Sequence, residues 1–141
     1  MEIMESKLRH LELVQGVINR MANNSFLLKG WAVTLEAGIF ALAAKDTNKL
    51  YFLIAYIPII VFWGLDAYYL LQERLYRSLY EKVQQTKEDK IDFSLKATTQ
   101  EFNSNKNCYL NCLFSVTELW FYLPLAIVCG IIIIITNIWI I

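Results

Sequence analysis

The sequence predicts an all-α membrane protein with three transmembrane helices, an N-terminal amphipathic helix and a helical cytosolic extension, assembled as an oligomer. Of its 141 residues, 57% are hydrophobic and only 18% are charged, against about 25% charged in an ordinary soluble domain. Residues 50–71 and 119–141 form two apolar runs, and each exceeds the roughly 20 residues that a helix needs to cross a bilayer. This pattern disfavours a secreted enzyme, a nucleic-acid-binding domain and a disordered regulator.

The N-terminal segment, residues 1–25, has the apolar spacing of an amphipathic helix on the cytosolic side or in the membrane interface. Its stripe consists of Leu8, Leu11, Val14, Ile18 and Met21. Packing against the rest of the chain and lying in the membrane interface both explain such a stripe. Residues 23–25, Asn-Asn-Ser, are typical of a helix cap, so we expect the helix to end there.

Residues 26–44 predict the first transmembrane helix, although Lys29 and Glu36 interrupt it. A lysine near the end of a span can reach the headgroups, whereas a central glutamate must face protein or water. Gly30, Thr34 and Gly38 recur at every fourth position. Small residues at this spacing let two helix backbones approach closely in lipid, which predicts a helix-packing face.

The remaining segments follow from composition and periodicity. Residues 45–49 are polar and predict an external turn, and residues 50–71 predict the second transmembrane helix, in which Pro58 can produce a kink. The helical pattern continues to about Gln85, and residues 72–118 predict a cytosolic helical extension with a loosely ordered polar insert. A third helix, starting near Cys108, includes the span 119–141, with Trp120 and Tyr122 suited to one membrane interface and Trp139 to the other.

The distribution of basic residues predicts the orientation. With three spans, residues 1–29 and 72–118 share one side and carry eleven of the thirteen Lys and Arg, while the other side carries Lys45 and Lys49. Because basic loops stay inside, we expect a multi-pass protein with a cytosolic N-terminus and an external C-terminus.

No constellation of residues in the sequence suggests an enzyme, and we expect no catalytic residues, no metal site and no cofactor. The single histidine, His10, lies on the amphipathic helix, and Cys108 and Cys112 are too few ligands for zinc. A nucleophile with an attendant base and a glycine-rich phosphate loop are also missing from the sequence.

Two acidic residues inside predicted spans, Glu36 and Asp66, are candidates for a pore or gate. Ionisable residues are costly in lipid, so their presence there suggests function, and rings of acidic side chains select cations in channels. Structural explanations remain open: Asp66 can pair with Arg74 or Lys29, and Glu36 can be protonated or hydrogen-bonded between helices.

A basic and aromatic cytosolic surface is a candidate ligand-binding site. Arginine holds phosphate as a fork and tyrosine offers a face for base stacking. The alternative is a solvated helix face laced by ion pairs. The candidate residues are Arg9, Arg20, Arg74, Arg77, Lys82, Tyr76 and Tyr80.

Residues 10–35, HLELVQGVINRMANNSFLLKGWAVTL, and 63–74, WGLDAYYLLQER, resemble a family of small bacterial membrane proteins of anti-phage defence loci, which includes the channel effectors of the Hailong system. The resemblance covers roughly residues 8–80. It implies a bacterial inner-membrane location and a homo-oligomeric channel held shut by a nucleotide or oligonucleotide that a partner nucleotidyltransferase makes.

These observations together predict an oligomeric inner-membrane channel-type effector that disrupts the membrane when a cytosolic signal changes. The alternative is a non-conducting membrane adaptor that anchors a soluble partner protein. A membrane enzyme or small transporter is disfavoured, because the sequence offers no polar cluster for either.

Overall fold

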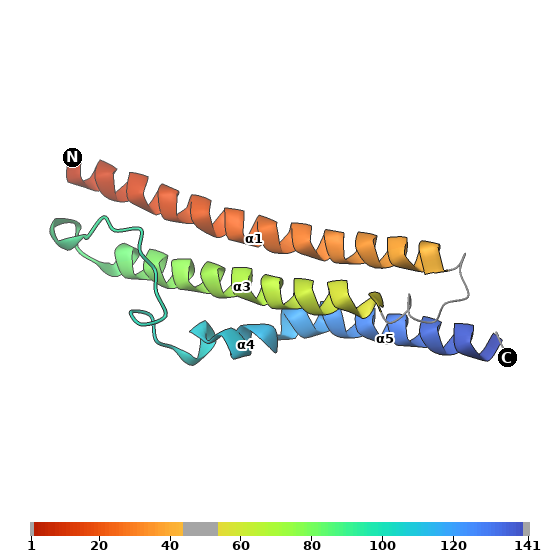
Figure 1. Ribbon diagram of the computed structural model, residues 1–141. Coiled ribbons are helices and arrows are strands. Elements are labelled where there is room, and N and C mark those ends of the chain that lie inside the picture. Colours follow the sequence, from red (N-terminus) through yellow and green to blue (C-terminus); the bar gives the residue numbers. More distant parts are fainter. Residues whose placement is uncertain (1, 44–53, 140–141) are drawn as a thin grey trace. The chain divides into compact units, whose positions relative to one another are not determined.

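The computed structural model describes residues 2–43 and 54–139, and in these ranges the chain is helical with no strand. The predicted all-helical class is therefore confirmed for the described residues. Figure 1 shows the elements in order. They are α1 (Glu2–Ala43), α3 (Tyr56–Gln85), the short 3-10 helices η1 (Glu88–Lys90) and η2 (Asn105–Asn107), α4 (Tyr109–Leu113) and α5 (Val116–Trp139).

Helix α1 runs without interruption through residues 23–25, so the predicted cap at this point is wrong. Asparagine and serine each cost a helix interior less than about 1 kcal/mol relative to alanine. With neither proline nor glycine between residues 17 and 29, nothing in this stretch is strong enough to end the helix. The amphipathic segment and the first predicted span are consequently parts of one helix.

Two stretches of the described helices are long and apolar enough to cross a membrane, Met4–Ala43 in α1 and Val116–Ile135 in α5. They include nearly all of the first predicted span and residues 119–135 of the third. The predicted external turn, 45–49, and the start of the second predicted span lie outside the described residues. Residues 56–71 of that span belong to α3, which ends at Gln85 as predicted.

The prolines and the third helix differ from expectation. Pro58 lies in the first turn of α3, where a helix needs no backbone donor, so it causes no kink inside that helix. Pro124 instead lies inside α5. The helix predicted to start near Cys108 is divided in two, because the chain leaves helical geometry at Phe114 and Ser115 between α4 and α5.

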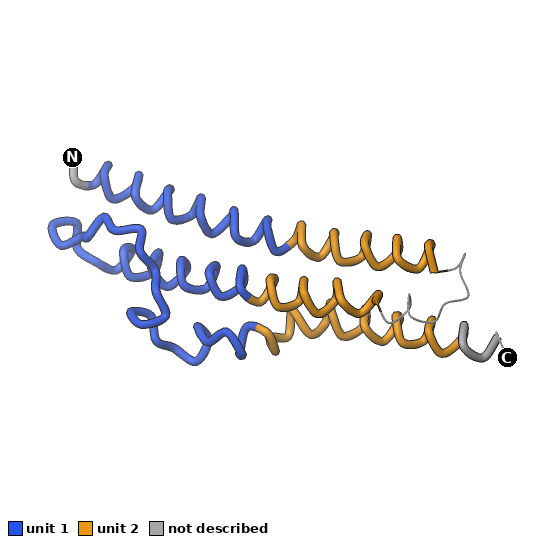
Figure 2. Tube along the Cα trace, viewed as in Figure 1, with its two compact units in different colours: residues 1–25, 68–112 blue, residues 26–67, 113–141 orange. Residues whose placement is uncertain are grey.

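The chain divides into two compact units, coloured separately in Figure 2. Unit 1 comprises residues 1–25 and 68–112. In its core Val14 and Ile18 of α1 pack against Leu79 and Val83 of α3. Three of the five residues of the predicted apolar stripe, Leu11, Val14 and Ile18, thus pack in the unit 1 core, whereas Leu8 is exposed.

The polar insert of unit 1 is packed rather than loosely ordered. Ile91, Ala97 and Phe102 pack against the unit 1 core, and the ring of Phe93 meets that of His10 edge to face. The buried Asn107 side chain donates a 2.9 Å hydrogen bond to the carbonyl oxygen of Phe102. The insert had too few apolar residues to predict this packing from sequence.

Unit 2 comprises residues 26–67 and 113–141, and segments of α1, α3 and α5 lie side by side in it. Its core contains Ala32, Ala55, Ile59, Tyr122 and Cys129. Gly130 permits a close approach of α3 to α5, since a Cβ at this position would lie 2.9 Å from the hydroxyl oxygen of Tyr56. That hydroxyl donates a 3.2 Å hydrogen bond to the carbonyl oxygen of Ala126.

Replacement of Leu79 by alanine tests the unit 1 core. Leu79 is 4% exposed, and truncating a buried leucine costs about 2–5 kcal/mol of stability. We expect Leu79→Ala to lower the thermal unfolding midpoint and to speed proteolytic cleavage within residues 86–107. Leu8→Ala is the matched control, because Leu8 is largely exposed. Equal behaviour of the two variants would contradict this packing.

Candidate functional site

Among the described residues of unit 2, the charged side chains face inward, whereas many large apolar side chains face outward. Its described part contains four charged residues, Lys29, Glu36, Asp66 and Glu118. The three acidic residues are buried, and the Lys29 side chain is only 20% exposed. The exposed side chains are mostly large and hydrophobic. They include Phe26, Trp31, Leu42, Ile60, Val116, Trp120 and Ile134.

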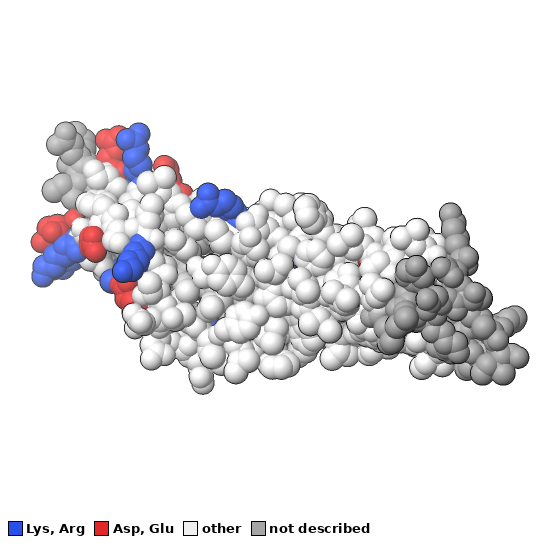
Figure 3. All heavy atoms as spheres, in the orientation of Figure 1, with Lys and Arg blue, Asp and Glu red and all other residues white. Residues whose placement is uncertain are grey.

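Unit 1 has the opposite distribution. On the face shown in Figure 3, most of the visible Lys, Arg, Asp and Glu side chains belong to the N-terminal part of α1, the end of α3 and the insert. A water-facing surface is expected to be charged, whereas a lipid-facing surface is apolar and keeps its ionisable groups inside. Among the described residues, the surface of unit 2 is therefore mostly apolar and that of unit 1 is charged.

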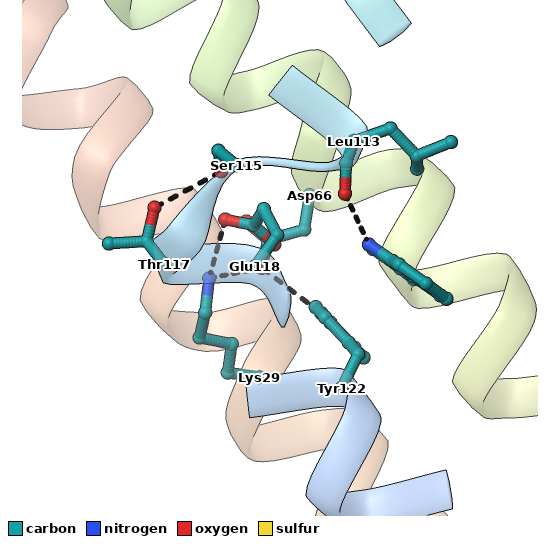
Figure 4. A network of polar contacts seen from close by, with 8 residues as sticks. Lys29, Asp66, Leu113, Ser115, Thr117, Glu118 and Tyr122 are labelled. Atoms are coloured by element: carbon teal, nitrogen blue, oxygen red, sulfur yellow. Dashed lines mark hydrogen bonds and ion pairs between the residues drawn. The ribbon is translucent and has the colours of Figure 1, made fainter. Parts of the chain in front are cut away.

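One cluster of side chains contains three of the four charged residues in the described part of unit 2. It consists of Lys29, Asp66 and Glu118 together with the uncharged Tyr122, and we call it the charged junction (Figure 4). Lys29 from α1 forms an ion pair with Asp66 from α3, and its Nζ lies 3.3 Å from Oε1 of Glu118 at the start of α5. The Tyr122 hydroxyl donates a 3.0 Å hydrogen bond to Oδ2 of Asp66. The junction thus joins all three helices of unit 2.

Aromatic side chains cover the charged junction. The Trp63 ring stacks on Tyr122, with centroids 6.0 Å apart and planes 11° apart. Its indole Nε1 donates a 2.9 Å hydrogen bond to the carbonyl oxygen of Leu113 at the end of α4. The ammonium of Lys29 lies 5.8 Å from the ring centroids of both Phe121 and Tyr122, a cation–π distance. The rings keep water from a set of charges whose attraction is stronger in low dielectric.

Glu36 lies apart from the charged junction. It is seven residues beyond Lys29 on α1, which places it on the same helix face about 10 Å along the axis. It is 4% exposed, and its Oε2 has no hydrogen-bond partner. The Tyr56 hydroxyl and the Cys129 thiol are its electrostatic neighbours. Glu36 and Asp66, the two predicted pore or gate residues, are therefore both buried but occupy different levels of unit 2.

The predicted helix-packing residues lie on the outside of unit 2. Gly30, Thr34 and Gly38 are exposed, and a Cβ at either glycine would meet nothing within 4 Å. Thr34 satisfies its own hydroxyl by donating a 2.8 Å hydrogen bond to the carbonyl oxygen of Gly30. No described residue thus packs closely against the two glycines of this face.

The predicted ligand-binding residues are not gathered into one surface. Arg9 and Arg20 are exposed on α1. Arg77 pairs with Glu73 at 2.7 Å, and Arg74 donates a 2.8 Å hydrogen bond to the carbonyl oxygen of Lys106. The two predicted tyrosines, Tyr76 and Tyr80, pack against the unit 1 core.

A cavity of about 270 Å³ lies in unit 1, and Lys82 is the only one of these predicted residues in its lining. Lys82 lies 2.6 Å from Oε1 of Glu101, and its Nζ is 5.9 Å from the centroid of the Phe102 ring. The insert supplies two further lysines, which the sequence analysis did not select. The polar and charged residues of the lining are Lys82, Thr86, Lys90, Asp92, Ser94, Lys96 and Glu101.

Sequence reasoning also missed Glu118 and Tyr122. The third span was drawn from residue 119 and so excluded the only acidic residue of α5. Tyr122 was assigned to the membrane interface, but it is fully buried, whereas its neighbour Trp120 is 77% exposed. Extending the span one turn toward the N-terminus would have placed Glu118 inside it.

No family model, characterised protein or solved structure matches this chain.

Replacement of Lys29 tests the charged junction. We expect Lys29→Met to destabilise the protein by about 3–5 kcal/mol, because it leaves buried carboxylates without their cation. Combining it with Asp66→Asn and Glu118→Gln should restore most of the lost stability, since no buried charge then remains. The measurement is the thermal midpoint and the membrane-integrated yield of each variant.

The matched control is Lys87→Met, an exposed lysine of unit 1. A triple variant that is less stable than Lys29→Met alone would contradict the electrostatic account.

Proposed function

We propose that the chain is an oligomeric inner-membrane channel-type effector, gated by a cytosolic signal and disrupting the membrane when activated. The observation that carries the proposal is the inverted charge distribution of unit 2, which buries its acidic residues and exposes apolar side chains. Ionisable residues inside membrane helices face a bundle interior or a water-filled path, and they mark ion pathways.

Conduction by this chain needs several copies. Three membrane helices are too few to enclose a water-filled pore, so the helices of neighbouring copies must complete it. The open face at Gly30, Thr34 and Gly38 supports such an assembly, because small residues at this spacing allow close helix packing in lipid. In this arrangement three spans place the N-terminus in the cytosol and the C-terminus outside.

Glu36 is the residue that we assign to the pore. Its Oε2 has no hydrogen-bond partner among the described residues, so a carboxylate oxygen is available to a passing cation once the helices move apart. Asp66 has a different role, because it is bound by Lys29 and Tyr122. We assign it to the gate, which these contacts hold closed.

Unit 1 is the part that we propose to receive the signal. Its cavity has three lysines in the lining, and lysine binds phosphate as a point charge. A volume of about 270 Å³ is slightly below the range of small-molecule pockets, about 300–1,000 Å³. It suits one phosphate-bearing unit of a nucleotide-derived ligand. The resemblance to anti-phage effectors supports a partner nucleotidyltransferase as the source of that ligand.

Membrane potential in bacteria that express the chain tests the channel. We expect wild-type protein to depolarise the cells and Glu36→Gln to abolish the effect at equal membrane levels, because the substitution removes the pore carboxylate. Glu12→Gln is the matched control, since Glu12 is an exposed glutamate on the same helix. Depolarisation that persists in Glu36→Gln would exclude Glu36 from the pore. Cells that stay polarised with every variant, also during phage infection with the neighbouring genes, would favour the non-conducting adaptor.

Binding of ATP, used as a mononucleotide probe, tests the unit 1 cavity. We expect Lys90→Gln combined with Lys96→Gln to weaken binding to the purified protein at least tenfold, because two cations leave the lining. Higher salt should weaken the wild-type affinity as well. Lys87→Gln is the control, since this exposed lysine is outside the lining. Equal affinities of all three proteins for ATP, measured by calorimetry, would contradict a role of this cavity in binding the signal.

A further inference from the structure

The charged junction has a charge imbalance that its own side chains do not resolve. Lys29 brings one positive charge, and Asp66 and Glu118 bring two negative charges when both are ionised. The nearest other buried acidic group, Glu36, is two helical turns away, and the remaining polar member of the junction, Tyr122, is a neutral donor. An uncompensated charge buried in low dielectric is strongly unfavourable.

The two carboxyl groups of the junction share one ammonium. Oδ2 of Asp66 and Oε1 of Glu118 both contact Nζ of Lys29, and Oδ1 of Asp66 and Oε2 of Glu118 are buried without a hydrogen-bond partner among the described residues. Two ionised carboxylates that share one cation in this way repel each other. A proton on one of the two carboxyl groups removes this repulsion and supplies a donor that the unpartnered oxygens lack.

From this geometry we infer that the Asp66–Glu118 pair is a binding site for one exchangeable proton, which keeps the junction neutral and α1, α3 and α5 together. Release of the proton leaves a second negative charge beside a single ammonium, so the three helices lose part of their attraction. Nothing in this inference requires the chain to conduct ions.

The surrounding donors decide which carboxyl holds the proton. Oδ2 of Asp66 receives hydrogen bonds from both Lys29 and Tyr122, which stabilise a carboxylate. Glu118 receives one donor, Lys29 at 3.3 Å, and its Oε2 has no donor partner. Glu118 is thus the acid and Asp66 the carboxylate, with the unpartnered Oδ1 of Asp66 and Oε2 of Glu118 available for the shared proton.

Infrared spectroscopy of the full chain in detergent micelles at neutral pH tests this site. We expect wild-type protein to show the carbonyl band of a protonated carboxylic acid, with a shift in heavy water because the proton is exchangeable. Glu118→Gln should lose this band and keep its thermal midpoint, since a neutral amide replaces a neutral acid. Asp66→Asn should lower the midpoint, because Lys29 loses its carboxylate. Glu36→Gln is the matched control, which removes a different buried carboxyl and should keep the junction band.

Several outcomes would overturn the inference. Wild-type protein without such a band has both carboxyl groups ionised, and this arm of the test needs no variant to fold. A band that survives Glu118→Gln places the proton elsewhere. If the protein lacks the band and its thermal midpoint rises steeply with sodium or potassium concentration, a metal cation instead of a proton binds between the two carboxyl groups. The measurement involves no ion flux, so it can fail while the proposed channel stands, and the reverse also holds.

Discussion

The ammonium of Lys29, held between the carboxyl groups of Asp66 and Glu118, is the interaction on which unit 2 depends. It is the one charge-based contact there that joins α1, α3 and α5 among the described residues. In lipid there is no hydrophobic force to press helices together, so packing and interhelical polar contacts must hold them. The aromatic cover of Trp63 and Tyr122 strengthens this contact by excluding water. The apolar exterior of unit 2 is compatible with lipid because the charged side chains of its described residues lie inside.

Much of this arrangement was predictable from sequence. The helical class, the end of α3 at Gln85 and the pairing of Asp66 with Lys29, one of two partners considered, all followed from periodicity and from the cost of charge in lipid. Glu118 was not predicted because a span defined by apolar residues begins after the charged residue, whereas the helix α5 includes that residue. The burial of Tyr122 was not predicted because interfacial and buried tyrosines occur in similar local sequences. Only its partner, distant along the chain, tells them apart.

Unit 1 was harder to predict, for a different reason. The sequence identifies basic residues on a helix as candidates for a ligand-binding surface. Which of them lie together depends on the loop that folds over the helix. Arg74 and Arg77 satisfy backbone and side-chain acceptors nearby, and the cavity instead gathers lysines from the insert. A polar insert of this kind has no periodicity, and its few apolar anchors, such as Phe102, reveal its position only once packed.

The spacing of the junction along the chain has a consequence for biogenesis. Lys29 is synthesised 37 residues before Asp66 and 89 residues before Glu118. A charged residue at the centre of a span costs about 2.5–3.5 kcal/mol at the translocon. In a bilayer, α1 would enter before α3 and α5 supply the carboxyl partners of Lys29, and the junction could form only after α5 follows. A chain truncated before α5 would accordingly be a poorly inserted intermediate, and so a substrate for membrane quality-control proteases.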